Sequence, residues 1–286
     1  MPTKPGLSPL SGQSVSCGSV YLVLRRRHTV ANVGTYLLRR LKRRHAMSHD
    51  FQSDGAMTML TREAINSGAY LEHFESLPNL WTTERIQNSL AETMQARPVD
   101  ATDTWIFAYG SLMWNPMIEF DKRQIATLHG WHRSFCLRMV VGRGSQDGPG
   151  RMLALRPGGD TYGVALKLPQ ATLDEELRLI WIREMVLGSY RPTWASVTLD
   201  DGTETHAIAF VADESRDQFE PDSCVATVAP LIGAATGKLG SNTDYLLKLR
   251  EALIECGLRD AYVEELCNEI ERLSRRACCD IPGASE

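Results

Sequence analysis

A series of short strand-like segments joined by turns, in the middle of the chain, constrains the fold more than any other feature. These segments are rich in β-branched and aromatic residues, and they cover residues 105–109, 125–131, 134–141, 151–156, 162–168, 196–199 and 206–212. Asp201-Gly202 separates the last two segments and is a strong signal for a hairpin turn. Many short strands linked by hairpins favour a sheet that closes into a small barrel.

Helical patterns lie mainly at the two ends of this series. Their apolar residues recur every three or four positions, and they cover residues 61–71, 83–96, 173–187, 225–235, 243–256 and 262–274. Strands gathered at the centre, with helices gathered at both ends, favour the α+β class over a sheet in which strands and helices alternate. We therefore predict an α+β fold, a small mixed β-barrel with flanking helices.

Charge divides the chain into a basic head and an acidic body. Residues 1–46 hold nine of the 31 Lys and Arg residues and none of the 35 Asp and Glu residues, so the remainder has a net charge of −13. We expect a disordered basic extension over 1–46, a helical segment and linker over 47–103, the barrel domain over 104–275 and a disordered tail over 276–286. An acidic body is a poor ligand for nucleic acid, so no nucleic-acid partner is expected.

Three interpretations of the head remain open. It is an organellar presequence, a tail that binds nucleic acid or a membrane surface, or a stretch upstream of a true start at Met47, and we favour the last. The chain has no run of 18 apolar residues, so we expect no membrane-spanning helix. Its seven cysteines are odd in number and form no CxxC motif, which is typical of reduced thiols in the cytoplasm.

Motifs for several other chemistries are incomplete. The stretch 233–239 is one residue short of a phosphate-binding P-loop, and Gly110-Ser111 lacks the second glycine of a nucleophilic serine elbow. His129 and His132 are too few to form a zinc site, and we predict no metal site.

Two features point to chemistry. The first is the end of the strand at 105–109, where Tyr109-Gly110-Ser111-Leu112 presents backbone N–H groups and a hydroxyl at the rim of the sheet. A concave backbone of this kind can bind a carboxylate without a basic side chain.

The second feature is Glu184, in the helix predicted over 173–187. At about 100° per residue, Glu184 lies between Leu177 and Ile180 in the middle of the apolar stripe, whereas Glu175 and Glu176 lie outside it. A carboxylate that faces the core must be paired or protonated, or serve a purpose. Two interpretations follow: a buried salt bridge, for example with a neighbour of Arg183 or with Arg191, or a general base whose pKa is raised by desolvation.

Together these motifs resemble the ChaC-type γ-glutamylcyclotransferases, in their bacterial branch. The resemblance rests on Tyr109–Leu112 and on residues 181–190, and it continues through 130–136, 150–155, 229–232 and 242–247. It covers roughly residues 57–275, and it identifies 104–275 as a γ-glutamylcyclotransferase-like catalytic domain.

The resemblance implies that glutathione is cleaved to 5-oxoproline and cysteinylglycine without a cofactor. It implies that Glu184 is the catalytic acid and base, and that Tyr109, Gly110, Ser111 and Leu112 hold the γ-glutamyl group. Tyr245 is expected to line the pocket and Arg133 to bind a substrate carboxylate, in a monomeric enzyme. Two alternatives stay open. The protein catalyses the same reaction on other γ-glutamyl amino acids or amines, or it is a non-catalytic module with a γ-glutamyl-binding or regulatory role.

Overall fold

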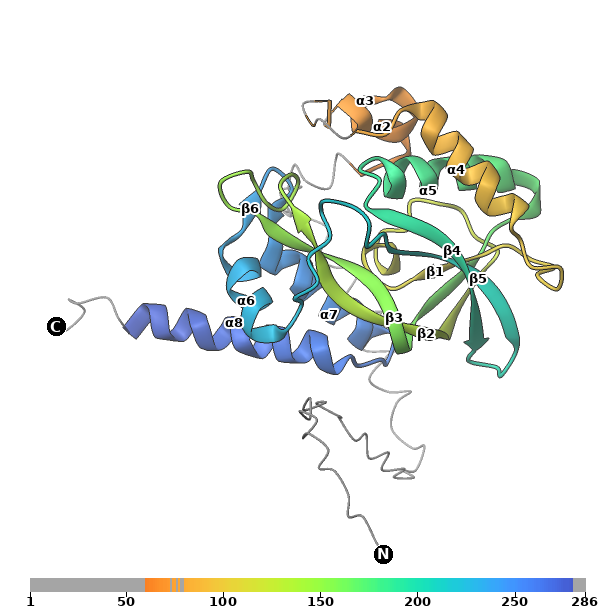
Figure 1. Cartoon of the computed structure of the whole chain (residues 1–286). Coiled ribbons are helices and arrows are strands. Elements are labelled where there is room, and N and C mark those ends of the chain that lie inside the picture. The colour runs from red at the N-terminus through yellow and green to blue at the C-terminus, as the bar shows by residue number, and fades with distance from the viewer. Residues whose placement is uncertain (1–59, 73, 76, 78–79, 280–286) are drawn as a thin grey trace, which may run out of the picture. The chain divides into compact units, whose positions relative to one another are not determined.

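The centre of the fold is a closed β-barrel, seen in a computed structural model that describes residues 60–72, 74–75, 77 and 80–279 (Figure 1). Its strands are β1 (Trp105–Ala108), β2 (Lys122–Met139), β3 (Gly150–Lys167), β4 (Tyr190–Leu199) and β5 (Glu204–Ala212), and they follow the order β1-β3-β2-β4-β5. β1 pairs with β5 in parallel, and the other neighbours pair antiparallel. The predicted α+β fold with a small mixed barrel is therefore confirmed.

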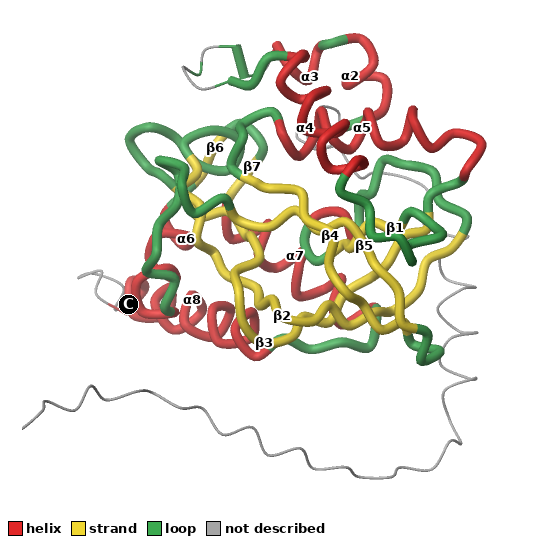
Figure 2. The backbone as a smooth tube through the Cα atoms, turned by 45° about the vertical axis from the view of Figure 1, so that its right-hand side comes forward, coloured by secondary structure: helices red, strands yellow, loops and turns green. Residues whose placement is uncertain are grey.

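Helices flank the barrel in two groups. They are α2 (Arg62–Ser67), α3 (Ala69–Glu72), α4 (Thr83–Gln95), α5 (Leu173–Met185), α6 (Val225–Ala234), α7 (Asn242–Glu255) and α8 (Ala261–Cys279), with 3₁₀ turns η1 (Ser111–Met113) and η2 (Gln170–Thr172) and the short strands β6 (Thr236–Gly237) and β7 (Gly240–Ser241). Figures 1 and 2 show α2, α3, α4 and α5 together beside the barrel, and α6 and α8 together elsewhere. None of the described helices combines the length and the hydropathy of a membrane span.

The two longest strands were each predicted as two separate strands. The breaks predicted at residues 132–133 and 157–161 are absent, because the two strands bulge near Gly130 and Pro157–Gly159 and then continue. Gly130 has a φ of 79°, and the register between β2 and β3 shifts there. Glycine adopts this left-handed conformation without strain and commonly marks a bulge. The result is one long β2·β3 ribbon that forms much of the barrel wall.

Two helix ends also differ from the prediction. The helix predicted over 61–71 is interrupted by Gly68, whose φ of 87° ends α2 before α3 begins. At the other end of the chain, α8 continues to Cys279, past the predicted end at Ser274 and into the predicted tail over 276–286. Residues 261–281 contain no glycine or proline that would end this helix earlier. Residues 280–286 and the predicted extension over 1–46 lie outside the described residues.

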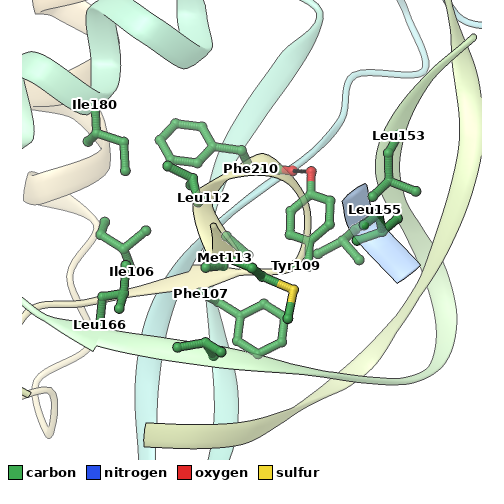
Figure 3. Close-up of a cluster of buried hydrophobic side chains, with 14 of the residues drawn as sticks. Ile106, Phe107, Tyr109, Leu112, Met113, Leu153, Leu155, Leu166, Ile180 and Phe210 are labelled. Carbon is green, nitrogen blue, oxygen red and sulfur yellow. Dashed lines mark hydrogen bonds between the residues drawn. The ribbon is translucent and has the colours of Figure 1, made fainter. Parts of the chain in front are cut away.

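The core fills the barrel and continues under the helices that flank it. Figure 3 shows Ile106 and Phe107 of β1 packed with side chains from β3, β5 and α5, and each of these two residues is fully buried. The same cluster includes Leu112 and Tyr109, which follow β1 directly. The strand–loop transition of β1 is therefore fixed by packing on one side while its other side faces a cavity.

Candidate active site

One cavity of about 400 Å³ opens beside the end of β1. Its walls come from the loop after β1, from α5 and α7, from β2, β3 and β5, and from the segment before α4. Five of the predicted site residues line it, namely Tyr109, Gly110, Ser111, Leu112 and Tyr245, and Glu184 lines it as well. A cavity of this size accommodates a small peptide.

The loop Tyr109–Leu112 is held in place by hydrogen bonds to the rest of the protein. The Tyr109 hydroxyl donates to the carbonyl oxygen of Phe210 at 2.5 Å, which ties the loop to β5 (Figure 3). Gly110 caps η1, and its carbonyl accepts the N–H of Met113 at 2.9 Å. None of the hydrogen bonds found in the described part of the chain uses the Leu112 N–H. This donor is therefore available at the start of the turn.

Glu184 reaches the cavity from the last turn of α5. Its side chain is 14% exposed, so the carboxylate is mostly desolvated but still touches the cavity. Burial raises the pKa of Glu184 above its ordinary value, and the guanidinium of Arg183 opposes that rise. A carboxyl with a raised pKa beside a cavity is suited to proton transfer near neutral pH.

Arg183 is the ionic partner of Glu184, rather than the Arg191 that sequence reasoning suggested. Its Nε lies 3.0 Å from Oε1 of Glu184, whereas Arg191 is exposed on β4. The same guanidinium donates to the hydroxyl oxygen of Ser111 at 2.8 Å and to the carbonyl oxygen of Asn115. The Glu184 carboxylate therefore forms a buried ion pair, as the first interpretation expects. It also faces the cavity, as the second interpretation, a general base, requires.

Tyr245 approaches the loop from α7. A Cβ atom added at Gly110 would lie 3.0 Å from the Tyr245 hydroxyl, so the absence of a side chain there permits the close approach. The Tyr245 ring packs edge-on against Trp114, with ring centroids 5.5 Å apart. Burial raises the pKa of Tyr245, and the nearby charge of Glu184 raises it further, so the phenol stays neutral at physiological pH.

The structure does not place Arg133 at the cavity. Its side chain is 1% exposed and pairs with Asp260 at 2.9 Å, while it also donates to the carbonyl oxygens of Tyr109 and Tyr162 at 2.9 and 2.7 Å. With its donors already bound by protein, the predicted role as the ligand of a substrate carboxylate is wrong. Arg133 instead fixes the backbone of Tyr109 at the base of the loop.

Sequence reasoning missed several residues that surround the site. Arg183 received no role, Tyr70 and Tyr190 line the cavity unforeseen, and Glu176 was placed outside the apolar stripe. Glu176 is in fact fully buried and pairs with Arg62 at 2.7 Å. A basic residue directly beside Glu184 was the one available signal, since the other contacts join residues far apart in the sequence.

Comparison with known proteins agrees with this geometry. The family model "ChaC-like protein" matches residues 104–273. The chain is 45% identical over 217 residues to the glutathione-specific γ-glutamylcyclotransferase of Escherichia coli (strain K12), which covers 75% of this chain and 94% of that protein. It is 29% identical over 187 residues to the human glutathione-specific γ-glutamylcyclotransferase 1, covering 64% of this chain and 84% of that one.

A solved structure has the same fold. The crystal structure of a γ-glutamyl cyclotransferase specific to glutathione from yeast superposes with a TM-score of 0.54 at 21% sequence identity, covering 60% of this chain and 99% of that one. The family match over residues 104–273 spans the loop Tyr109–Leu112, Glu184 and Tyr245. The chain therefore belongs to the ChaC-like protein family.

Proposed function

We propose that this protein is a glutathione-specific γ-glutamylcyclotransferase that cleaves glutathione to 5-oxoproline and L-cysteinylglycine. The observation that carries the proposal is a mostly buried carboxylate, that of Glu184, facing a peptide-sized cavity beside the loop Tyr109–Leu112. The relatives in E. coli and human are both named for this activity.

The reaction is intramolecular, so the enzyme does not have to supply a nucleophile. The α-amine of the γ-glutamyl group attacks the γ-carbonyl carbon of the same group and forms a new C–N bond, which closes a five-membered ring. The amide bond to the cysteine nitrogen then breaks, and cysteinylglycine leaves. Folding the substrate into the geometry for attack contributes several kcal/mol to the rate, of the order of 7–11 in the best cases.

Glu184 moves the protons in this scheme. The α-amine has an ordinary pKa of about 7.7–8.0, so it arrives largely protonated and cannot attack in that form. A free Glu, with a pKa of about 4.3, is a weak base for this ammonium, whereas the raised pKa of buried Glu184 brings the two groups closer together. Glu184 accepts one proton from the ammonium before attack, and the attacking nitrogen loses a second proton as the new C–N bond forms. The cysteine nitrogen takes up both protons and leaves as an ammonium group, the first of them donated by Glu184 as the amide bond breaks.

The loop Tyr109–Leu112 binds the γ-glutamyl group and stabilises the negative charge that develops on the carbonyl oxygen. The Leu112 N–H is an available donor, and the Ser111 hydroxyl can donate because its oxygen already accepts from Arg183. Preorganised donors aimed at a developing oxyanion provide about 3–4 kcal/mol each. The neutral phenol of Tyr245 closes the same side of the cavity.

Product analysis with a matched pair of variants tests the proposal. Purified protein is incubated with glutathione, and both 5-oxoproline and cysteinylglycine are measured for wild type, Glu184→Gln and Glu175→Gln. Glu175 lies on the same helix, but its side chain is half-exposed and does not line the cavity. We expect equimolar products from wild type and Glu175→Gln and none from folded Glu184→Gln.

The same assay separates the alternatives. Turnover of γ-glutamyl-alanine with no turnover of glutathione keeps the mechanism but changes the substrate. Binding of glutathione with no product from wild type supports a non-catalytic module. Near-normal turnover by Glu184→Gln removes Glu184 as the base.

We also propose that the enzyme acts as a monomer in the cytoplasm and has no nucleic-acid partner. The acidic body of the chain, with a net charge of −13 after residue 46, disfavours a nucleic-acid partner. The cysteines with described side chains, Cys136, Cys224, Cys256 and Cys267, are free thiols, which is typical of a reducing compartment.

A further inference from the structure

The segment before the barrel contributes a wall of the catalytic cavity. Tyr70 of α3 and Phe74, which follows α3, both line this cavity, and their side chains are almost completely buried. Their rings meet edge-on, with centroids 5.1 Å apart. Both residues precede 104, where the match to the family model begins. The cavity is therefore closed by residues outside the matched domain.

Tyr70 lies against the part of α5 that carries the catalytic carboxylate. Its hydroxyl donates to the carbonyl oxygen of Arg183 at 3.1 Å, one residue before Glu184. The negative charge of Glu184 contributes to the raised pKa of Tyr70, which indicates that the two groups are close. The phenol bonds to backbone rather than to the carboxylate, so its ring covers the site without neutralising Glu184.

This wall is fixed to α5 on both sides of Glu184. Near the start of α5, Arg62 of α2 forms an ion pair with the fully buried Glu176 at 2.7 Å. Beyond the end of α5, the backbone N–H of Trp81 donates to the carbonyl oxygen of Val186 at 2.9 Å. Trp81 also packs so closely on Gly188 that a Cβ atom there would lie 1.9 Å from its indole nitrogen. Figures 1 and 2 show α2 and α3 beside α5 in both views.

We propose that Tyr70 and Phe74 form a hydrophobic wall that keeps water away from Glu184, and that Tyr70 is thereby a positioning residue for the general base. The inference rests on the proposed role of Glu184. It assigns a task to the helical segment that precedes the barrel: this segment completes the environment in which the base works. Without the wall, the carboxylate is hydrated and becomes a weaker base.

The pH dependence of activity reports this environment. The groups that face Glu184 are Arg183 on α5, Tyr70 on α3, Tyr109 after β1, Tyr190 on β4 and Tyr245 on α7. Arg143 lines the same cavity from the loop between β2 and β3. Burial raises the pKa of each of these tyrosines, so none of them ionises in the acidic range. The acidic limb of kcat/KM therefore follows Glu184.

The experiment compares the pH profile of glutathione cleavage in the full chain for wild type, Tyr70→Phe, Tyr70→Ala and Ile65→Ala. Ile65 is a buried residue of α2 that does not line the cavity, so its truncation matches the packing defect without opening the wall. We expect Tyr70→Ala to move the acidic limb to lower pH and to lower kcat at neutral pH about tenfold. Tyr70→Phe retains the ring and the limb, and Ile65→Ala lowers Tm only.

The outcomes distinguish this inference from the proposed function. An unmoved acidic limb in folded Tyr70→Ala, with inactive Glu184→Gln, overturns the wall and leaves the base intact. An active Glu184→Gln overturns the base itself. If Tyr70→Ala does not fold, Phe74→Ala provides the same test, because Phe74 lines the cavity beside Tyr70, and an unmoved limb there overturns the wall equally.

Discussion

The Nε atom of Arg183 lies 3.0 Å from Oε1 of Glu184, and the same guanidinium donates to the Ser111 hydroxyl oxygen at 2.8 Å. One cation therefore joins the proposed base on α5 to the loop that follows β1. The pKa of Glu184 reflects two opposing effects, since burial raises it and Arg183 lowers it. Variants that remove the cation or expose the carboxylate are therefore expected to shift the pKa of Glu184 in opposite directions.

Removing the cation is expected to move the acidic limb in the direction opposite to that of opening the wall. In Arg183→Gln the positive charge is lost, so the pKa of Glu184 rises and the acidic limb of kcat/KM moves to higher pH, by about one pH unit or more. Arg183→Lys keeps the charge but not the fork geometry and should shift the limb less. The measurement is the pH profile of glutathione cleavage.

Arg178→Gln is the matched control for this shift. Arg178 lies on the same helix, is exposed and does not line the cavity. Its profile should overlay that of wild type. An acidic limb in Arg183→Gln that coincides with the wild-type limb would mean that Arg183 does not act on Glu184.

Replacing the base is expected to stabilise the protein at neutral pH. The folded-state pKa of Glu184 is raised, so its protonated form is favoured by folding. That contribution is fully present below the unfolded-state pKa, about 4.3, and is lost as pH rises through the folded-state pKa. Glu184→Gln resembles the protonated form, so its Tm relative to wild type should rise between acidic and neutral pH. A constant difference in Tm would contradict the buried carboxylate.

The sequence was sufficient for the order and type of the elements because their patterns are local. Asp201-Gly202 marked the β4–β5 hairpin, and the apolar periodicity over 243–256 marked α7, which begins with a capping box of Ser241 and Asp244. Local signals misled at residues 132–133 and at 157–161, where strands were predicted to end although β2 and β3 continue. A glycine that ends a strand and a glycine that bulges one look alike until the partner strand is known.

The residues of the candidate site also fall into those that local sequence patterns reveal and those that only the fold brings together. Glu184 and Tyr109–Leu112 were singled out because helix periodicity and a strand end are visible in one stretch of sequence, and all of them line the cavity. The role of Arg133 was wrong because its partner Asp260 lies 127 residues away. The burial of Glu176 was missed for a similar reason, since Arg62 lies 114 residues before it. Pairs that only the fold brings together cannot be read from spacing.

Arg133 is expected to matter for stability rather than for substrate binding. Arg133→Met removes one partner of a buried ion pair and two donors to backbone carbonyls, which should lower the free energy of unfolding by about 3–5 kcal/mol. Arg156→Met, which removes a more exposed pair with Glu214, should cost less than about 1 kcal/mol. Denaturant unfolding measures both. A large rise in KM for glutathione at unchanged stability would restore Arg133 as a substrate ligand.

Gly110→Ala is expected to lower activity more than stability. The φ of Gly110 is negative, at −132°, and a new Cβ atom there would lie 3.0 Å from the Tyr245 hydroxyl and 3.4 Å from Leu153. The clash falls inside the cavity, so kcat/KM should drop about tenfold or more. Combined with Tyr245→Phe, the loss should be smaller than the sum of the two single losses, because the second change removes the contact. If the two losses in kcat/KM are strictly additive, the effect of Gly110→Ala does not come from its contact with Tyr245.

A chain that begins at Met47 is expected to keep full activity. The family model matches residues 104–273, and the side chains assigned to Glu184, Tyr245 and the loop Tyr109–Leu112 all lie within that range, far in the sequence from the acid-free basic stretch 1–46. Its kcat and KM for glutathione should equal those of the full chain, since none of the assigned side chains is lost. A chain that begins at Thr82 lacks Tyr70 and Phe74 and should be far less active, even if its barrel folds. Loss of activity already in the chain from Met47 would show that the basic head takes part in the enzyme.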